Sequence, residues 1–314
     1  MQRVVKVAAA QMGPIARDET RQSAVARMVA LMEEAHGEGV DLIGYPELAL
    51  TTFFPRWFIE DEAELDSYYE TEMPNAATQP LFDAAVRLGI AFHLGYAELA
   101  VIDGAKRRFN TAILVDKTGA IVKTYRKVHL PGHTEHEPWR PFQHLEKRYF
   151  ETGATGFEPF HALGGVLGMC ICNDRRWPET WRVLALKGAE LVMVGYNTPT
   201  HYPPVPEHDH LQDFHNHLCL QSAAYQNGLW VVGVAKAGRE EGCDLIGGSC
   251  IVAPTGELLG VAKTLGDELV IADCDLERCK EIHHNIFHFD LHRRPEHYTA
   301  ITAQRGIEPP PEGG

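Results

Sequence analysis

One stretch decides how the chain is organised: Gly168-Met169-Cys170-Ile171-Cys172-Asn173-Asp174-Arg175-Arg176-Trp177-Pro178-Glu179. The apolar run at residues 166–171 predicts a strand that ends in polar residues. Pro178 suits a first helical position and Glu179 favours the positive end of a helix dipole, so a helix should follow. A cysteine at such an elbow is expected to face solvent, near N–H groups and arginines that favour the thiolate. Cys172 therefore lies where a nucleophile would be placed.

Both cysteines of this stretch also have a simpler interpretation as small buried hydrophobes. We keep that interpretation for Cys170, which lies inside the predicted strand. Cys172 is followed by three charged residues within four positions, which is unusual for a core residue. From spacing alone, both interpretations of Cys172 stay open.

Composition and charge exclude several classes of protein. The 314 residues are 45% hydrophobic and show no linker, so we expect one domain over residues 1–300 and a flexible tail over residues 301–314. A net charge of −14 argues against nucleic-acid binding. No apolar run approaches the roughly 20 residues of a membrane span. Seven cysteines without framework spacing and no signal peptide predict a soluble cytoplasmic protein.

The first part of the chain predicts a parallel crossover. Residues 4–12 form a buried strand, residues 20–38 have helical spacing, and residues 41–48 form a strand that stops at Pro46. Glu47 follows that strand end, where side chains of α/β sheets reach ligands. A solvated loop glutamate is the simpler interpretation, but the neighbours of Glu47 are mostly apolar.

The next elements lead to a lysine. Residues 76–88 predict a helix, and three strands are predicted at residues 90–99, 108–116 and 120–130. Alternation along the last strand places Tyr125, Lys127 and His129 on one face. A lysine on a strand usually lies at an edge or on the surface, so Lys127 is a functional candidate only if it shares a pocket with Cys172. The long loop 131–150 has a length typical of functional loops.

The second half resembles the first. After the elbow we predict helices at residues 178–187 and 208–226, and strands at residues 190–196, 229–235, 247–254, 257–263 and 268–274. Residues 113–119 and 251–256 each end an apolar strand in a Thr-Gly turn. Two such halves suggest an α/β fold with two sheets face to face and helices outside, in which strand ends could meet at one pocket.

Glu47, Lys127 and Cys172 each fall at or near a predicted strand end. A carboxylate base, a lysine cation and a thiol nucleophile are the groups that acyl transfer from an amide needs. The carboxylate takes the thiol proton, the sulfur attacks the carbonyl carbon, and the ammonium stabilises the oxyanion.

The motifs around these residues resemble those of the carbon–nitrogen hydrolase (nitrilase) superfamily. They are Tyr45-Pro46-Glu47, Tyr125-Arg126-Lys127-Val128-His129-Leu130 and the stretch from Cys172 to Glu179. Longer stretches are similar to the N-carbamoyl-D-amino-acid hydrolases of that superfamily: residues 46–57, residues 140–150 and Asn197-Thr198-Pro199-Thr200.

The resemblance implies a four-layer α-β-β-α sandwich with no metal or organic cofactor, in cytoplasmic homodimers or homotetramers. It implies hydrolysis of an N-carbamoyl-D-amino acid to the D-amino acid, carbon dioxide and ammonia, through a carbamoyl thioester. Glu47 would be the general base, Lys127 the oxyanion stabiliser and Cys172 the nucleophile. Glu146 would support Lys127 and the substrate.

The same resemblance implies seven substrate-contacting positions: His129, His144, Asn173, Arg175, Arg176, Asn197 and Thr198. The arginines also make physical sense, because a guanidinium fork binds a carboxylate bidentately. An alternative for adjacent arginines is one inward and one solvated side chain. The preference for the D enantiomer rests on the resemblance only.

Three other functions stay open. A metallohydrolase could use His208, Asp209, His210, His215 and His217, but helical spacing divides these residues between two faces. A relative of the same family could act on β-ureidopropionate or an aliphatic amide. A binding protein without activity is disfavoured, because it need not retain all three reactive residues.

Assembly is expected through exposed helices and the C-terminal segment. There Phe287, Phe289, Leu291 and Tyr298 would supply apolar anchors. The alternative is a segment that packs on its own subunit.

Overall fold

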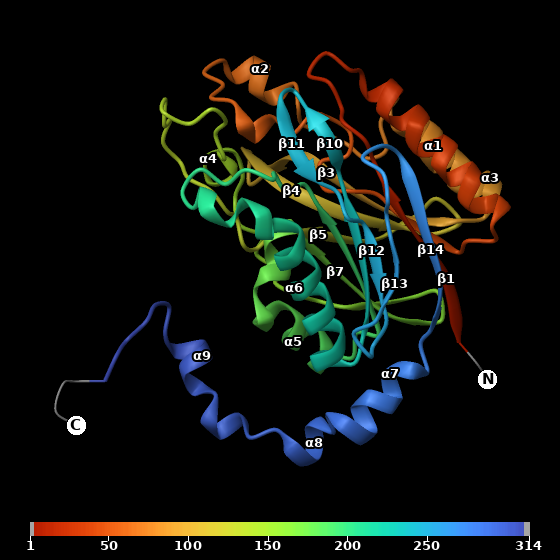
Figure 1. The fold of residues 1–314 in the computed structure, drawn as a ribbon. Helices are drawn as coiled ribbons and strands as arrows, with labels where there is room; N and C mark the ends of the chain where they lie inside the picture. Colours follow the sequence, from red (N-terminus) through yellow and green to blue (C-terminus); the bar gives the residue numbers. More distant parts are fainter. Residues whose placement is uncertain (1–2, 311–314) are drawn as a thin grey trace.

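The computed structural model describes residues 3–310, which form two six-stranded sheets packed face to face (Figure 1). The first sheet has the order β14 (Glu268–Asp275), β1 (Val4–Gln11), β2 (Leu42–Gly44), β3 (Ala91–Ile102), β4 (Ala105–Val115) and β5 (Ile121–Arg126). The second has the order β13 (Leu258–Val261), β12 (Cys250–Val252), β9 (Trp230–Ala235), β8 (Leu191–Tyr196), β7 (Gly165–Ile171) and β6 (Phe160–Ala162).

Helices cover the outer faces of both sheets. Helices α1 (Arg21–Gly37) and α3 (Gln79–Leu88) lie on the first sheet, and α5 (Pro178–Leu186) and α6 (Gln212–Asn227) lie on the second (Figure 1). The α-β-β-α sandwich expected from the sequence is confirmed. The remaining α-helices and strands in residues 3–310 are α2 (Glu62–Asp66), α4 (Glu146–Tyr149), α7 (Arg278–Glu281), α8 (Phe289–His292), α9 (Thr299–Ala303), β10 (Ala237–Glu240) and β11 (Cys243–Ile246).

Local chemistry sets the ends of the covering helices. The side chain of Thr20 accepts a hydrogen bond from the backbone N–H of Ser23 and so caps α1. Gly89, at φ 69°, ends α3 in the left-handed region. Pro178 is the first residue of α5, as predicted.

Parallel pairing brings the catalytic candidates to one end of the sandwich. Strands β1, β2 and β3 are parallel, as are β7, β8 and β9, and antiparallel strands extend both sheets. Between the sheets, Val7, Leu114, Met193 and Val232 are fully buried. Burial of each such side chain contributes about 1.5–3 kcal/mol to stability.

Several boundaries differ from the sequence prediction. Strand β5 ends at Arg126, so the alternation predicted for Lys127 and His129 does not apply. The loop 131–150 contains α4. A 3₁₀ helix, Pro206–Leu211, precedes α6, where a single helix was predicted, and the β10–β11 hairpin was not predicted.

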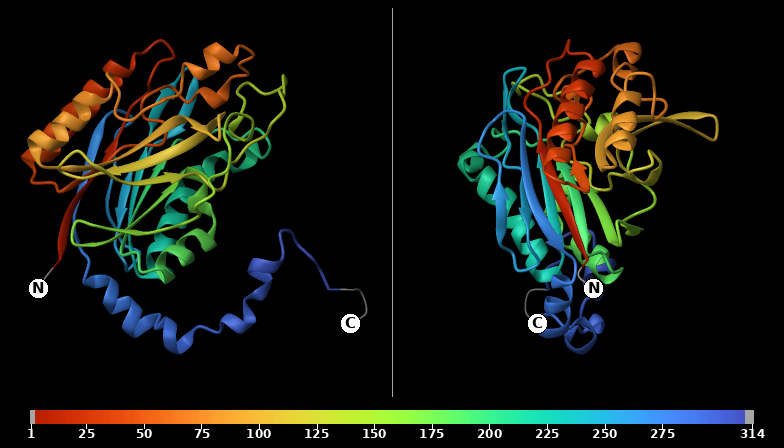
Figure 2. Two further views of the ribbon diagram at one scale, coloured as in Figure 1. Left: turned by 180° about the vertical axis from the view of Figure 1, so that it is seen from behind. Right: turned by 90° about the vertical axis from the view of Figure 1, so that its right-hand side faces the viewer.

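Residues 278–310, which begin with α7 and include α8 and α9, form an arc beneath the body of the protein (Figures 1 and 2). We call these residues the C-terminal arc. At its beginning Phe287 packs edge-on against Tyr225, with ring centroids 5.1 Å apart, and Phe289 lies under the guanidinium of Arg182. Residues 311–314 of the predicted flexible tail lie outside the described residues. None of the helices in residues 3–310 has both the length and the apolar composition of a membrane span.

Candidate active site

Three charged side chains meet in the interior. Glu47 lies three residues after β2, Lys127 directly follows β5, and Glu146 is the first residue of α4. The ammonium of Lys127 donates to Glu47 Oε1 at 2.7 Å and to Glu146 Oε2 at 2.6 Å. All three side chains are fully buried. Lys127 is therefore not the surface lysine that its place near a strand favours.

Two further side chains complete this cluster. Asn110, on β4, donates to Glu47 Oε1 at 2.7 Å and to Glu146 Oε2 at 3.4 Å. His144 Nε2 lies 3.2 Å from Glu146 Oε1. Asn110 is not predicted from the sequence, because a lone asparagine in a strand carries no pattern that points to a site.

Burial and mutual charge shift the pKa values of Glu47, Glu146 and Lys127 in this cluster. Burial raises the pKa of Glu47, although the charge of Lys127 opposes that shift. Burial alone would also raise the pKa of Glu146, but Lys127 and His144 have the larger combined effect, so the pKa of Glu146 is lowered overall. The pKa of Lys127 is raised because two carboxylates outweigh its burial. An ammonium paired with Glu146 thus lies beside Glu47, a carboxyl with raised proton affinity.

Cys172 begins the 3₁₀ helix Cys172–Arg176, directly after β7. Its φ of 46° is in the left-handed region, which costs a residue with a side chain about 1–3 kcal/mol and is common at functional sites. The side chain is only 7% exposed, and burial raises the pKa of its thiol to about 11. The prediction of a solvent-facing thiolate is therefore wrong. Cys170 is fully buried in the core, as predicted.

Glu47 and Cys172 influence each other electrostatically. After burial, the negative charge of Glu47 is the next cause that raises the pKa of the Cys172 thiol. The second oxygen of Glu47, Oε2, is buried and accepts no conventional hydrogen bond from the described residues. This arrangement can move a proton from sulfur to carboxylate, with an ammonium beside both groups.

Two glycines make room for the backbone of Glu47. A Cβ on Gly95, in β3, would lie 2.8 Å from Glu47 Cα, and a Cβ on Gly195, in β8, would lie 2.7 Å from Glu47 N. Real Cβ atoms essentially never come this close. Glu47 is therefore held between the two sheets by close backbone contact.

Asp174 fixes the elbow that carries Cys172. Its buried carboxylate accepts hydrogen bonds from the backbone N–H of Ile171 at 3.0 Å, the N–H of His129 at 2.8 Å and the hydroxyl of Tyr125 at 2.6 Å. This role of Asp174 is not predicted from the sequence, because a charged residue that follows a strand is usually solvated.

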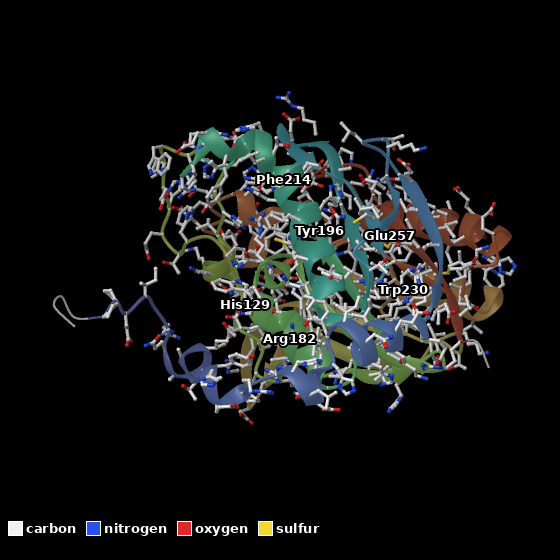
Figure 3. The ribbon with its side chains drawn as sticks, turned by 60° about the horizontal axis from the view of Figure 1, so that its bottom comes forward. His129, Arg182, Tyr196, Phe214, Trp230 and Glu257 are labelled. Carbon is white, nitrogen blue, oxygen red and sulfur yellow. The ribbon has the colours of Figure 1, made fainter. Side chains whose placement is uncertain are left out.

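The adjacent arginines have different environments. Arg175 is 2% exposed and donates to Cys172 O at 2.8 Å, Asn216 Oδ1 at 2.9 Å and Thr198 Oγ1 at 2.9 Å. Its guanidinium lies 4.4 Å from the ring centroid of Tyr196. Tyr196 is labelled in Figure 3, and its hydroxyl accepts a hydrogen bond from Asn216 Nδ2 of α6. These contacts occupy the fork that a substrate carboxylate would need.

The side chain of Arg176 has no hydrogen bond or ion pair within residues 3–310, and it borders the cavity that contains Cys172. That cavity has a volume of about 190 Å³ and is lined by Pro131, Gly132, His144, Cys172, Asn173, Arg176, Asn197, Thr198, Pro199, Tyr202 and Gln212. Five of the seven predicted substrate contacts therefore surround Cys172 directly, and Arg175 lies behind them.

His129 is the exception. It is absent from the lining of this cavity, and its ring stacks between Trp177, at 5.0 Å, and Phe157, at 5.8 Å. Its Nδ1 lies 2.8 Å from Asp174 Oδ1, and its carbonyl accepts a hydrogen bond from Asn173 Nδ2 at 3.2 Å. In this structure His129 reaches the cavity only through Asp174 and Asn173.

The histidines that could bind a metal ion are not grouped as a metal site in the described residues. Within residues 3–310, no three His, Cys, Asp or Glu side chains are grouped so that they could hold a metal ion. His208 and His215 approach edge-on, with ring centroids 6.3 Å apart, whereas His201 pairs with Asp209.

Known proteins share this architecture. The family model described as carbon-nitrogen hydrolase matches residues 6–284. A nitrilase of Pyrococcus abyssi (strain GE5 / Orsay) is 30% identical over 273 residues, which cover 87% of this chain and 90% of that protein. An N-carbamoylputrescine amidase of Solanum lycopersicum is 26% identical over 319 residues, or 98% of each chain. A solved carbon-nitrogen hydrolase of Helicobacter pylori G27 has a TM-score of 0.82 at 24% identity, over 96% of this chain and 99% of its own, and this likeness shows the fold.

Proposed function

The chain belongs to the carbon-nitrogen hydrolase family and is an amidohydrolase, and from this premise we propose that it hydrolyses N-carbamoyl-D-amino acids. One observation carries the proposal: the unpaired guanidinium of Arg176 borders the same cavity as Cys172. A ureido acid carries a carboxylate close to its scissile bond, and a guanidinium binds a carboxylate in two parallel hydrogen bonds. The relative named N-carbamoylputrescine amidase supports a ureido group as the reacting end. The D configuration rests on the motif resemblance.

The proposed reaction begins at Cys172. Its thiol proton passes to Glu47 Oε2 as sulfur attacks the ureido carbon, because at a pKa of about 11 the thiol is protonated at neutral pH. The carbonyl oxygen gains negative charge beside the ammonium of Lys127. Glu47 then returns the proton to the leaving nitrogen, which releases the amino acid and leaves a carbamoyl thioester.

Hydrolysis of the thioester completes the cycle. Glu47 removes a proton from water, which attacks the carbamoyl carbon, and the proton returns to sulfur. The released carbamate decomposes to carbon dioxide and ammonia. Glu146 keeps its negative charge throughout, because its lowered pKa leaves it ionised beside Lys127. Lys127 therefore stays protonated and fixed.

A substrate panel and a trapping experiment test the proposal. We expect turnover of N-carbamoyl-D-amino acids to exceed that of the L enantiomers, N-carbamoylputrescine, β-ureidopropionate and butyramide. Intact mass spectrometry with a slow ureido substrate should show one carbamoyl group on the protein, and Cys172→Ala should remove it. Preferred hydrolysis of butyramide or β-ureidopropionate would replace the proposed substrate with that alternative.

Arg176 provides the sharper test. Arg176→Ala should lower kcat/KM for an N-carbamoyl amino acid about tenfold to a hundredfold, the value of a hydrogen bond to a charged group. The loss should be smaller for the matching N-carbamoyl amino amide, whose end is neutral. Equal losses on both substrates would show that Arg176 does not bind the carboxylate.

A further inference from the structure

A second buried ion cluster lies beside the cavity and contains Arg56, to which the proposed mechanism gives no role. Arg56 ends the 3₁₀ helix Phe54–Arg56 and is 3% exposed. One arm of its guanidinium donates to Glu240 Oε1 at 2.8 Å, and the other donates to Asn197 Oδ1 at 2.8 Å. A single side chain thus joins the ion cluster to a residue of the Cys172 cavity.

This contact fixes the orientation of the Asn197 amide. A guanidinium carries only donors, so the atom of Asn197 that faces it must be the carbonyl oxygen. The amide nitrogen then points the other way. That nitrogen, Nδ2, is buried and has no hydrogen-bond partner in residues 3–310, although Asn197 is only 2% exposed and lines the cavity of Cys172. Such a donor is costly to leave unpaired, and a substrate oxygen would satisfy it.

Glu240 holds Arg56 in place. Its carboxylate also accepts from Lys236 Nζ at 3.1 Å and from the backbone N–H groups of Phe53 at 2.8 Å and Ile15 at 3.0 Å. Burial alone would raise the pKa of Glu240, but Lys236 and Arg56 lower it to about 2, so it is ionised at neutral pH. Glu240 thereby connects the segments after β1 and β2 with β10, and Arg56 has little freedom to move.

We propose that Arg56 is a positioning residue, which orients Asn197 so that Nδ2 donates to an oxygen of the substrate. Arg56 is not among the residues that line the Cys172 cavity, so it acts through Asn197. The identification of that oxygen as the substrate carboxylate rests on the function proposed above.

A double-mutant cycle tests this role with an N-carbamoyl-D-amino acid. Arg56→Lys keeps a positive charge near Glu240 but cannot bridge to Asn197 with a planar fork. It should raise KM about tenfold and leave kcat within about twofold, since one substrate hydrogen bond is lost and the reacting groups are unchanged. In an Asn197→Ala background, Arg56→Lys should raise KM by less than about a further twofold, because both changes remove the same substrate contact.

Two further variants separate positioning from stability. Asn197→Asp replaces the Nδ2 donor with an oxygen and keeps the ion pair of Arg56 with Glu240, so KM should rise at least as much as in Arg56→Lys. Arg21→Lys is the matched control: it removes a partly buried guanidinium that contacts Glu70 and the carbonyl of Ser67, none of which lines the Cys172 cavity, and KM should stay unchanged.

Three results would overturn the proposal: an unchanged KM in Asn197→Asp, an unchanged KM in Arg56→Lys, or a full additional loss from Arg56→Lys in the Asn197→Ala background. A wild-type protein that hydrolyses only simple amides would instead refute the proposed substrate. The same cycle measured with the accepted amide would then test Arg56.

Discussion

At the scale of single residues, Cys172 combines a buried thiol with an adjacent base, and this determines how its reactivity depends on pH. The pKa of the thiol is about 11, so the thiolate fraction should rise about tenfold for each pH unit below that value. We expect the rate of iodoacetamide inactivation to increase from about pH 7 to about pH 10 without levelling off. A plateau below about pH 8 would reveal a thiolate already formed in the resting enzyme.

Glu47 should be needed for chemistry more than for binding. Glu47→Gln keeps an amide oxygen for Lys127 and Asn110 to donate to, but it cannot take a proton from Cys172. We expect kcat to fall about 10²–10⁴-fold, the usual contribution of a general base, with an unchanged circular dichroism spectrum. If KM rose and kcat did not change, Glu47 would have to be reassigned to substrate binding.

Arg175 should act on stability, unlike its neighbour Arg176. Arg175→Ala leaves three buried acceptors without their donor: Cys172 O, Asn216 Oδ1 and Thr198 Oγ1. Each unsatisfied buried group costs about 1–3 kcal/mol, so urea denaturation should show a loss of at least about 2 kcal/mol. Arg176 lies at an exposed position, so the free energy of unfolding of Arg176→Ala should lie within about 0.5 kcal/mol of the wild-type value. Equal stability of the two variants would contradict this division.

At the scale of elements, the backbone of Glu47 lies against β3 and β8. This close contact explains why both strands have glycine there, at Gly95 and Gly195. Gly195→Ala would place a Cβ 2.7 Å from Glu47 N, so either strand β8 or the loop that carries Glu47 would have to move. We expect kcat to fall at least about tenfold, because small displacements of a catalytic group have large effects on rate. Gly37→Ala, where the added Cβ meets nothing within 4 Å, is the control. Full activity in Gly195→Ala would mean that the Glu47 loop is adaptable.

The sequence predicts these elements unevenly. Long apolar runs with clear caps, such as β1, α1 and β7 with α5, lie within a few residues of their predicted places, because burial and capping are local properties. Strand β5 ends at Arg126, one residue before Lys127, whose N–H still donates to Asn110 O and whose side chain enters the charged cluster. The hairpin β10–β11 escaped prediction because its strands are short and mix polar with apolar residues.

Prediction of the site residues from the sequence is likewise limited to residues that belong to a local pattern. Glu47, Lys127 and Cys172 are predicted as site residues because they lie at or near strand ends, and Glu146 is predicted from the motif resemblance. Asn110 and Arg56 contact residues far away in the chain, and no local pattern reports such contacts. The different environments of Arg175 and Arg176 depend on the turn of one 3₁₀ helix.

At the scale of the whole molecule, the C-terminal arc leaves apolar surface uncovered. Together with α5 and α6 it borders a cavity of about 630 Å³, and Leu218, Leu291 and Ile301 are 49%, 60% and 57% exposed. Apolar patches of this kind mark interaction sites in soluble proteins.

We therefore expect a dimer or larger assembly by light scattering at micromolar concentration. Two copies of charge −14 repel each other, so added salt should strengthen the assembly by screening that repulsion. Leu218→Asp, on α6, should shift the protein toward monomer, because it places a charge on the apolar patch. Val101→Asp, at a 73% exposed position on β3, should not. A monomeric wild type, or an assembly that Leu218→Asp leaves intact, would show that the arc and α6 do not form the interface.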